Sequence, residues 1–387
     1  MTQPHSDAAA LVVGLCSHGL AVSRALHQAG IKVFAVEQNA SLPGSATNTV
    51  QRLFIIDSFN DDCLIPALLD IRQQLSNFTQ LVLFATNDNH VRSFGLHLAH
   101  LCPAYLISWA DSFQAVLRLQ KKSELETVAR EQGLNYPKSM VLTTEEVSNA
   151  LKLESQLQDF IYPLIIKPVQ PLSSFKTQIA QNAQQLYAFL QQYHTDLPIL
   201  AQEYIAGGDE SLYFGALTLD SGHTIQAMVG RKLSSFPVAR GQTTIAEVVT
   251  NADVIKLTEQ FFAGFKLSGP VSLELKKAPD GSFWVIEPTV GRTDFWAELC
   301  IAAGFNQPLQ EFQLALKQQV TVTPINTQIS WFDAERAPLS YWQAVWQQKN
   351  IKPFGKKATF TFFCWSDWRP FLRACWNLFK RISSKRL

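Results

Sequence analysis

Glu274 and Glu287 have the spacing of a metal site, because they lie on two strand-like runs that flank a turn. If the hairpin turns at Asp280-Gly281, facing residue numbers have a constant sum, and Glu274 lies directly opposite Glu287. Like charges that face each other destabilise a sheet by up to about 1 kcal/mol, so we expect a cation between them. Magnesium takes one or two carboxylates and completes its shell with water and phosphate, which predicts a nucleotide–metal site. The alternatives are a solvated hairpin face, or a register shifted by one residue that separates the acids.

The overall composition permits an enzyme and argues against several other classes of protein. A chain of 387 residues exceeds the size at which one hydrophobic core stops growing, so we expect two or three domains. The 47% hydrophobic content indicates a globular protein, and the net charge of +1 gives no reason to expect a nucleic-acid partner. Without a signal-peptide pattern or an apolar run of about 18 residues, the chain is expected to be cytoplasmic. Its six cysteines are widely spread without zinc spacing, which indicates reduced structural thiols.

The first hundred residues alternate between short apolar runs and helical patterns. Apolar runs at 11–13 and 31–36, separated by an amphipathic stretch at 20–29, have the form of a βαβ unit. The turn between Gly14 and Gly19 lacks the G-x-G-x-x-G spacing. A plain tight turn is therefore favoured over a dinucleotide site.

Polar residues follow the next predicted strand, at 81–86. They are Asn87, Asp88 and Asn89, just past the carboxyl end of the strand. Open α/β sheets bind ligands at this position, but the same residue types also cap helices. Both interpretations stay open.

A second unit of strands begins near residue 162. The run at 162–167 is a short apolar strand that ends at Lys167, because Pro168 stops further pairing. After a polar helix at 182–193, another strand spans 198–205. Taken singly, Lys167 is better explained as a surface lysine at a strand end than as a ligand-binding residue.

Together, the order and spacing of these residues resemble the ATP-grasp superfamily of carboxylate–amine ligases, over roughly residues 11–320. The resemblance implies an α/β fold in which a Rossmann-like domain precedes an ATP-grasp domain whose two α+β subdomains clamp ATP. The implied bounds are 1–115 for the Rossmann-like domain, 116–325 for the ATP-grasp domain, about 135–205 for its small lid subdomain, about 206–325 for its larger catalytic subdomain, and 326–387 for a C-terminal extension.

The resemblance also implies a role for each motif. The residues implied to bind ATP are Lys122, Lys167, Ser173, Ser174, Lys176, Glu203, Tyr204, Ile205 and Glu210. Those implied to hold Mg²⁺, or Mn²⁺ in its place, are Glu274, Glu287 and Thr289. Those implied to stabilise the transferred phosphoryl group are Arg231, Arg292 and Lys167.

Two segments depart from the family pattern. The loop at 169–177 lacks the usual glycines, so its serines and lysine would have to hold the phosphates. After Glu287 the family usually has Glu-x-Asn-Pro-Arg, whereas here Thr289 stands in the asparagine position and Gly291 in the arginine position. Arg292 is shifted by one residue, and Asp294 is a candidate to replace the lost oxygen ligand.

The activity that the resemblance implies is ATP-dependent ligation of a small-molecule carboxylate to an amine. The carboxylate would be activated as an acyl-phosphate, and positioning and electrostatics would carry the catalysis. A nucleotide-binding regulator without turnover and a membrane-docked scaffold are the alternatives.

The end of the chain is aromatic and basic. Apolar residues recur at i, i+3 and i+4 from Trp368 to Ile382, while lysines and arginines occupy many of the remaining positions. A basic amphipathic helix of this kind can lie on the anionic inner face of a membrane. The alternative is a terminal helix that packs on its own domain with a solvated basic end.

Overall fold

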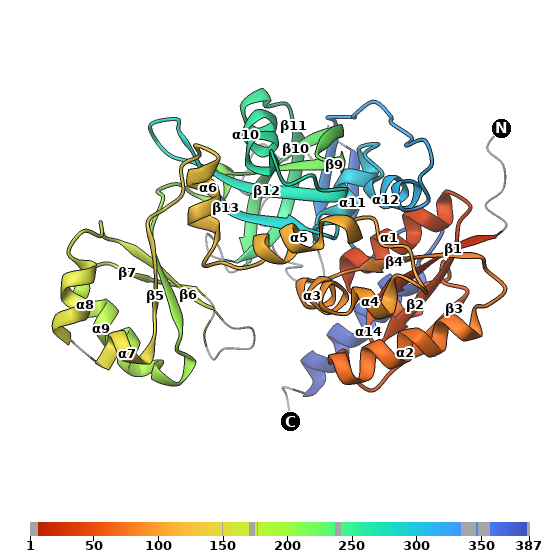
Figure 1. Cartoon of the computed structure of the whole chain (residues 1–387), viewed down its shortest axis with the longest axis horizontal. Helices are drawn as coiled ribbons and strands as arrows, with labels where there is room; N and C mark the ends of the chain where they lie inside the picture. Colours follow the sequence, from red (N-terminus) through yellow and green to blue (C-terminus); the bar gives the residue numbers. More distant parts are fainter. Residues whose placement is uncertain are drawn as a thin grey trace.

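The computed structural model describes residues 7–148, 150–169, 175, 177–236, 241–333, 346 and 357–384. The strands of this part of the chain form two sheets of four strands and one sheet of seven. Figure 1 shows the seven-stranded sheet at the centre, with the N-terminal sheet on one side and the smaller sheet on the other. The predicted α/β fold is confirmed.

The N-terminal sheet is parallel and has the strand order β3-β2-β1-β4. Its strands are β1 (Ala8–Val13), β2 (Lys32–Glu37), β3 (Arg52–Ile55) and β4 (Gln80–Ala85). Its helices are α1 (Ser17–Gln28), α2 (Asp61–Gln74), α3 (Asp88–Leu96) and α4 (Leu98–Leu101). β1 is buried throughout, because both faces of the sheet pack against hydrophobic clusters.

The turn from β1 into α1 requires two glycines. Gly14 has a φ of 88°, which a residue with a side chain rarely adopts. A Cβ on Gly19 would lie 2.1 Å from the carbonyl oxygen of Gly14, so the helix approaches the loop too closely for any other residue. The predicted tight turn is therefore a place of close backbone contact.

The small sheet is antiparallel and has the order β5-β8-β6-β7. The chain reaches it through α5 (Phe113–Leu119) and α6 (Leu125–Glu131). Its elements are β5 (Ser139–Leu142), α7 (Thr144–Ser148), α8 (Ala150–Leu157), β6 (Leu164–Pro168), β7 (Gln178–Ala180), α9 (Ala183–Gln192) and β8 (Ile199–Glu203). A separate hydrophobic cluster, which includes Leu142, Leu164 and Leu186, forms its core. We call residues 135–205 the lid subdomain.

The central sheet has the order β13-β12-β9-β10-β11-β14-β15. Its strands are β9 (Leu212–Asp220), β10 (His223–Phe236), β11 (Gln242–Val249), β12 (Gly269–Lys277), β13 (Phe283–Val290), β14 (Ile329–Phe332) and β15 (Lys357–Phe360). Helices α10 (Ala252–Phe262), α11 (Ala297–Ala302) and α12 (Gln307–Ala315) pack against it. Neighbouring strands are antiparallel except for β14 and β15, which pair in parallel.

The described part of residues 326–387 is divided between two bodies. β14 and β15 extend the central sheet, whereas α14 (Arg369–Ser384) packs against the short helix η1 (Pro43–Ala46) of the N-terminal domain. Figure 1 shows α14, in dark blue, beside the N-terminal domain. Among the described residues, no helix is long and apolar enough to cross a membrane.

Candidate active site

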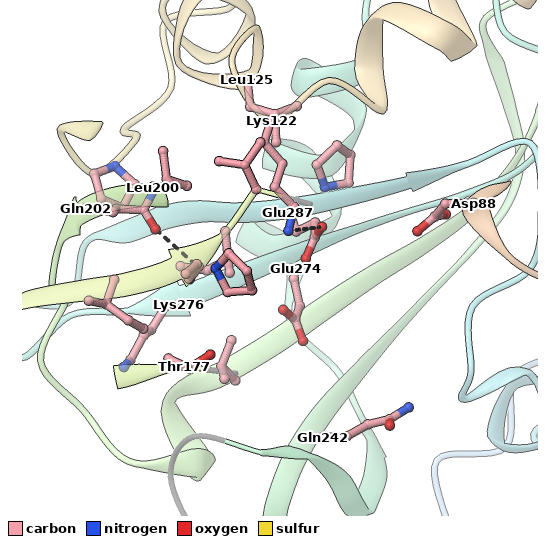
Figure 2. A pocket seen from close by; sticks show the side chains of 18 of the residues that line it. Asp88, Lys122, Leu125, Thr177, Leu200, Gln202, Gln242, Glu274, Lys276 and Glu287 are labelled. Atoms are coloured by element: carbon pink, nitrogen blue, oxygen red, sulfur yellow. Dashed lines mark hydrogen bonds and ion pairs between the residues drawn. The ribbon is translucent and has the colours of Figure 1, made fainter. Parts of the chain in front are cut away.

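A cavity of about 1020 Å³ lies between the lid subdomain and the central sheet. Its walls come from β6 and β8 of the lid subdomain, from β10 to β13 of the central sheet, and from the segment around Lys122. Asn87, Asp88 and Asn89, which follow β4, also line it. The residues that follow β4 therefore line the same cavity as Glu274 and Glu287. Figure 2 shows Asp88 and the two glutamates in this cavity.

The two acids face each other, but for a different reason from the one the sequence suggested. Near the turn, Leu275 pairs with Val285, a register that would have set Glu274 opposite Ile286. A β-bulge then shifts the register, and Glu274 pairs with Glu287. The predicted pairing is confirmed, and both side chains line the cavity.

The electrostatics around Glu274 leave it short of positive charge. Burial raises the pKa of Glu274 to about 7; Lys232 opposes this shift, while Glu287 and Asp294 add to it. A divalent cation beside Glu274 would favour the charged form of its carboxylate and lower this pKa. The two facing carboxylates therefore fit a hard divalent ion.

Lysines crowd the same cavity. Lys122 Nζ lies 3.8 Å from Glu287 Oε1, and Lys167 Nζ donates to Gln202 Oε1 at 3.0 Å. Burial lowers the pKa of Lys276 to about 8, and Lys232 and Lys167 lower it further. These four lysines, 122, 167, 232 and 276, all line the cavity, so they repel one another and favour an anion among them.

Lys232 and Lys276 line the cavity, although the sequence analysis did not predict this. Lys276 lies two residues after Glu274 on one strand, so strand alternation alone would have placed both on one face. Lys232 is buried, and its Nζ lies 3.3 Å from Asp209 Oδ1. Its neighbour Arg231 is the residue that the resemblance implied for the phosphoryl group.

The structure does not bring Arg231 to the cavity. Its Nη2 lies 2.5 Å from Glu247 Oε1, and its Nε donates to the same oxygen at 3.1 Å. Successive residues of a strand point to opposite faces, and because Lys232 faces the cavity, Arg231 faces away from it. The prediction that Arg231 faces the phosphoryl group is therefore not supported by its position, and Lys232 lines the cavity instead.

Arg292 lies at the edge of the cavity rather than inside it. Its Nε is 2.7 Å from Asp88 Oδ1, and Asp88 lines the cavity (Figure 2). Its side chain is 12% exposed, so the pair joins the central sheet to the N-terminal domain across partly buried space. Because Asp88 occupies its Nε, the Arg292 guanidinium could contact an anion only through its other N–H groups.

Three of the residues predicted to bind ATP follow one another at the end of β8. Glu203, Tyr204 and Ile205 all line the cavity. The Glu203 carboxylate accepts a hydrogen bond from the backbone N–H of Ile161 at 3.1 Å, and Tyr204 N donates to Pro163 O at 3.1 Å. These contacts fix the segment as it leaves β8.

Glu210 and Thr289 are not brought to the cavity. Glu210 is exposed in the short helix η4 (Asp209–Ser211), where its neighbour Asp209 turns inward to Lys232. The Thr289 hydroxyl donates to Asp294 Oδ2 at 2.8 Å and is buried. The predictions that Glu210 binds ATP and that Thr289 is the third metal ligand are therefore corrected, because neither residue lines the cavity.

Asp294 is already occupied by protein donors. Its Oδ2 also accepts from the Ser272 hydroxyl at 2.8 Å, and its Oδ1 accepts from Phe295 N at 2.7 Å. Within the part of the chain that the structure describes, no three His, Cys, Asp or Glu side chains form a metal cluster. An ion here would therefore depend on the two glutamates and on oxygens from its ligand. Ser173, Ser174 and Lys176 lie outside the described residues.

The architecture matches several solved enzyme structures. L-amino acid ligase from Bacillus licheniformis has a TM-score of 0.59 at 16% identity, with 81% of this chain and 75% of that chain covered. N5-carboxyaminoimidazole synthetase from Staphylococcus aureus, complexed with ADP, has a TM-score of 0.63 at 13% identity, with 82% and 79% covered. The biotin carboxylase domain of 2-oxoglutarate carboxylase from Hydrogenobacter thermophilus, in complex with MgADP, has 0.63 at 10%, with 83% and 73% covered.

Sequence comparison alone finds no relative: no family model matches the chain, and no curated protein does. The structural matches nevertheless extend over most of this chain and over most of each neighbour. The chain therefore shares the overall fold of these solved structures, as its resemblance to the ATP-grasp superfamily implied.

Proposed function

We propose that the protein is an ATP-dependent ligase that activates a carboxylate as an acyl-phosphate and joins it to an amine. The observation that carries the proposal is that two facing carboxylates and four lysines line one cavity. Burial raises the pKa of Glu274 and lowers the pKa of Lys276, so it disfavours the charged form of both groups. A metal–triphosphate complex would relieve both, because it brings a divalent cation for the carboxylates and an anion for the ammonium groups.

The lining residues suggest an orientation for the nucleotide. Adenine would lie against residues 203–205, where backbone groups and the apolar side chain of Leu200 meet. The phosphates would extend toward Lys122, Lys167 and Lys276, and end near the facing glutamates. The lid subdomain and the larger catalytic subdomain at 206–325 would hold the nucleotide between them.

Glu274 and Glu287 are the residues that would hold Mg²⁺, with Mn²⁺ as a substitute. When bound, such an ion offsets charge on the outer phosphates. Thr289 and Asp294 bond to each other, so we assign neither of them to the ion. Two carboxylates are sufficient for magnesium when phosphate and water complete its shell.

The proposed reaction has two steps. An oxygen of the substrate carboxylate attacks the γ-phosphorus, the bond to the β,γ-bridging oxygen breaks, and ADP leaves. The amine then attacks the acyl carbon, the bond from that carbon to the phosphate-bearing oxygen breaks, and an amide and inorganic phosphate form. Lys167, whose Nζ donates to Gln202 Oε1, would offset charge on the transferred group.

The carboxylate and amine would bind at the end of the cavity that the N-terminal domain contributes. Asn87 caps α3, because its Oδ1 accepts from His90 N at 2.9 Å, and Asp88 Oδ1 pairs with Arg292. The exposed side chains of Asp88 and Asn89 would therefore offer the substrates a carboxylate oxygen and an amide. Ligands of open α/β sheets bind outside the carboxyl ends of the strands, where these three residues lie. Amino acids, small organic acids and amino sugars match these polar groups.

The test replaces the unknown amine with hydroxylamine, which converts any acyl-phosphate into a hydroxamate. Candidate acids are screened one at a time with ATP and Mg²⁺, and ADP, phosphate and hydroxamate are measured together. A ligase gives all three with one class of acid, in equal amounts. If ATP binds tightly and no acid produces ADP, with hydroxylamine or with an amine, the protein is a nucleotide-binding regulator and the proposal is wrong.

A further inference from the structure

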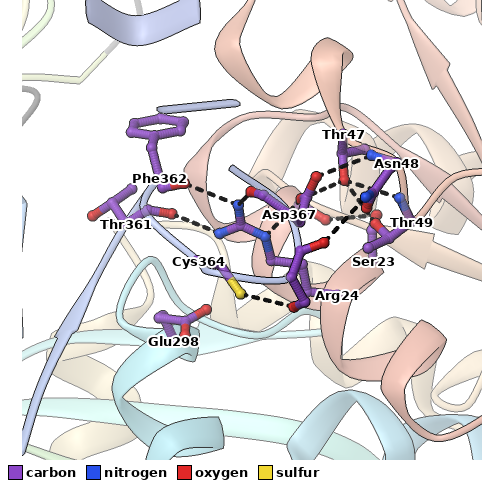
Figure 3. Close-up of polar contacts among 12 residues, drawn as sticks. Ser23, Arg24, Thr47, Asn48, Thr49, Glu298, Thr361, Phe362, Cys364 and Asp367 are labelled. Carbon is purple, nitrogen blue, oxygen red and sulfur yellow. Dashed lines mark hydrogen bonds and ion pairs between the residues drawn. The ribbon is translucent and has the colours of Figure 1, made fainter. Parts of the chain in front are cut away.

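The C-terminal segment is fixed to the N-terminal domain by one buried arginine. Arg24, on α1, has its Nε 2.9 Å from Asp367 Oδ2, and the two side chains are 5% and 1% exposed. Its Nη2 also donates to the carbonyl oxygens of Phe362 and Asp367, at 2.9 and 2.8 Å. Asp367 further accepts from the Thr47 hydroxyl at 2.7 Å (Figure 3). The start of α14, two residues later, therefore has a defined position.

The orientation of α14 is opposite to the usual one for an amphipathic helix. Its packed side consists of Pro370, Ala374 and Asn377; Ala374 is 7% exposed, and Asn377 donates to Ser41 O at 3.0 Å. A surface helix normally turns its apolar stripe toward the core. Here the core-facing side is small and partly polar.

The apolar stripe of α14 faces outward instead. The exposed apolar side chains of this helix and the segment before it are Trp365, Trp368, Phe371, Leu372, Trp376, Leu378 and Phe379. Trp365 is 86% exposed and Phe379 is 64% exposed. Contiguous exposed apolar surface of this kind marks an interaction site, because leaving it in water is costly. We call these side chains the α14 apolar face.

The charge of the segment identifies what can cover this face. Residues 368–387 contain six lysines and arginines and no aspartate or glutamate. A groove of about 540 Å³ between α14 and η1 is lined by Trp368, Arg369, Arg373 and Trp376, among others. Lys380 Nζ lies 5.3 Å from the centre of the Trp376 ring. Indole rings beside guanidinium and ammonium groups suit the headgroup level of an anionic bilayer.

We propose that α14 docks the protein on the surface of an anionic phospholipid bilayer. The α14 apolar face would enter the boundary between headgroups and acyl chains, while Arg369 and Lys380 contact lipid phosphates. The helix would lie in the plane of the surface, since it contains 16 residues with polar groups on one side. The Arg24 contacts would hold the N-terminal domain against the membrane.

The experiment is co-sedimentation of the full chain with vesicles of pure phosphatidylcholine or of phosphatidylcholine mixed with phosphatidylglycerol. We expect binding to the mixed vesicles alone, and weakening of that binding as salt is raised. The test variant is Trp376→Ser/Phe379→Ser, which should reduce the bound fraction at least about tenfold. The charge variant is Arg369→Gln/Lys380→Gln. Val322→Ser is the matched control, because Val322 is 54% exposed and lies outside α14.

Each outcome decides the proposal. Loss of binding in both variants but not in Val322→Ser supports it. Absence of binding to either vesicle overturns it, as does equal binding to neutral and anionic vesicles. Self-association that disappears in Trp376→Ser/Phe379→Ser, without vesicle binding, would assign the face to a second copy of the chain instead. All the substituted side chains are exposed, so unchanged circular dichroism and thermal unfolding should exclude misfolding.

Discussion

Glu274 and Glu287 face each other across the β12–β13 hairpin because a bulge adds one residue to β13. With Lys122 Nζ 3.8 Å from Glu287, the pair lies between a lysine cluster and the polar residues that follow β4. Removing either carboxylate would therefore disturb the phosphate end of the cavity without touching the cores of the sheets. Mutations of these two residues can therefore change activity without unfolding the protein.

Glu287→Gln should abolish ADP formation while the fold is kept. The side chain is 53% exposed, so its amide replacement should cost little stability. Loss of one charged ligand should lower kcat by about 100-fold or more. ADP release and thermal unfolding are the two measurements. Glu259→Gln, an exposed acid on α10, is the control and should keep full activity, whereas full activity in Glu287→Gln would remove the metal assignment.

Neighbouring lysines on β12 should respond differently to the same substitution. Lys276 lines the cavity, while Lys277 is exposed with its Nζ 5.7 Å from the ring centre of Phe283. Lys276→Met should weaken ATP binding at least about tenfold, since a charge-assisted contact to phosphate is worth roughly 1.5–3 kcal/mol. Lys277→Met should change the Kd less than twofold. Titration calorimetry with ATP distinguishes the two, and an equal effect of both would refute the proposed phosphate path.

The sequence was informative wherever function depends on local spacing. Lys122, Lys167 and the segment 203–205 were predicted from the resemblance to family motifs, and all of them line the cavity. The pairing of Glu274 with Glu287 was predicted correctly, but partly by chance. The turn shifts the register by one residue from the predicted one, and the bulge shifts it back. A bulge leaves no reliable mark in a single sequence.

Errors arose where orientation depends on contacts distant in the chain. Arg231 could not be separated from Lys232 without knowing which face of β10 meets the lid subdomain. Thr289 occupies the position of a metal ligand in the family motif, but its hydroxyl donates a hydrogen bond to Asp294. The pairing of β14 with β15 joins segments more than twenty residues apart and in parallel, a non-local contact that strand patterns do not reveal.

Glu311 should make stability depend on pH. Burial raises its pKa from 4.5 to about 8, opposed by the hydrogen bond from Ser108. From pH 4.5 to 8 the unfolded chain releases this proton while the folded chain keeps it, so stability falls as pH rises across that window. Glu311→Gln removes this contribution, so relative to wild type it should become more stable by at most about 1.4 kcal/mol per pH unit.

The measurement is urea unfolding of both proteins at several pH values within that window. Their difference in apparent midpoint should grow steadily toward alkaline pH. Glu259→Gln, which replaces an exposed acid, should show no such trend. A constant difference between Glu311→Gln and wild type would mean that Glu311 is ionised in the folded protein.

The Arg24–Asp367 contact should dominate the attachment of the C-terminal segment. Asp367→Ala leaves a buried guanidinium without its carboxylate, which costs about 3–5 kcal/mol. Hydrogen exchange of α14 should accelerate strongly in this variant. Glu126→Ala, which breaks the more exposed Arg130–Glu126 pair, should cost less than about 1 kcal/mol and leave α14 protected. Equal protection of α14 in both variants would show that the helix is held by other contacts.

The central claim is that the two facing glutamates hold a divalent ion beneath the outer phosphates of a nucleotide. A crystal structure with ADP and Mn²⁺, with the ion located by its anomalous scattering, tests this most directly. We predict one anomalous peak between the carboxylates of Glu274 and Glu287, within bonding distance of a phosphate oxygen. Nucleotide bound in the cavity with no peak between these carboxylates would contradict it.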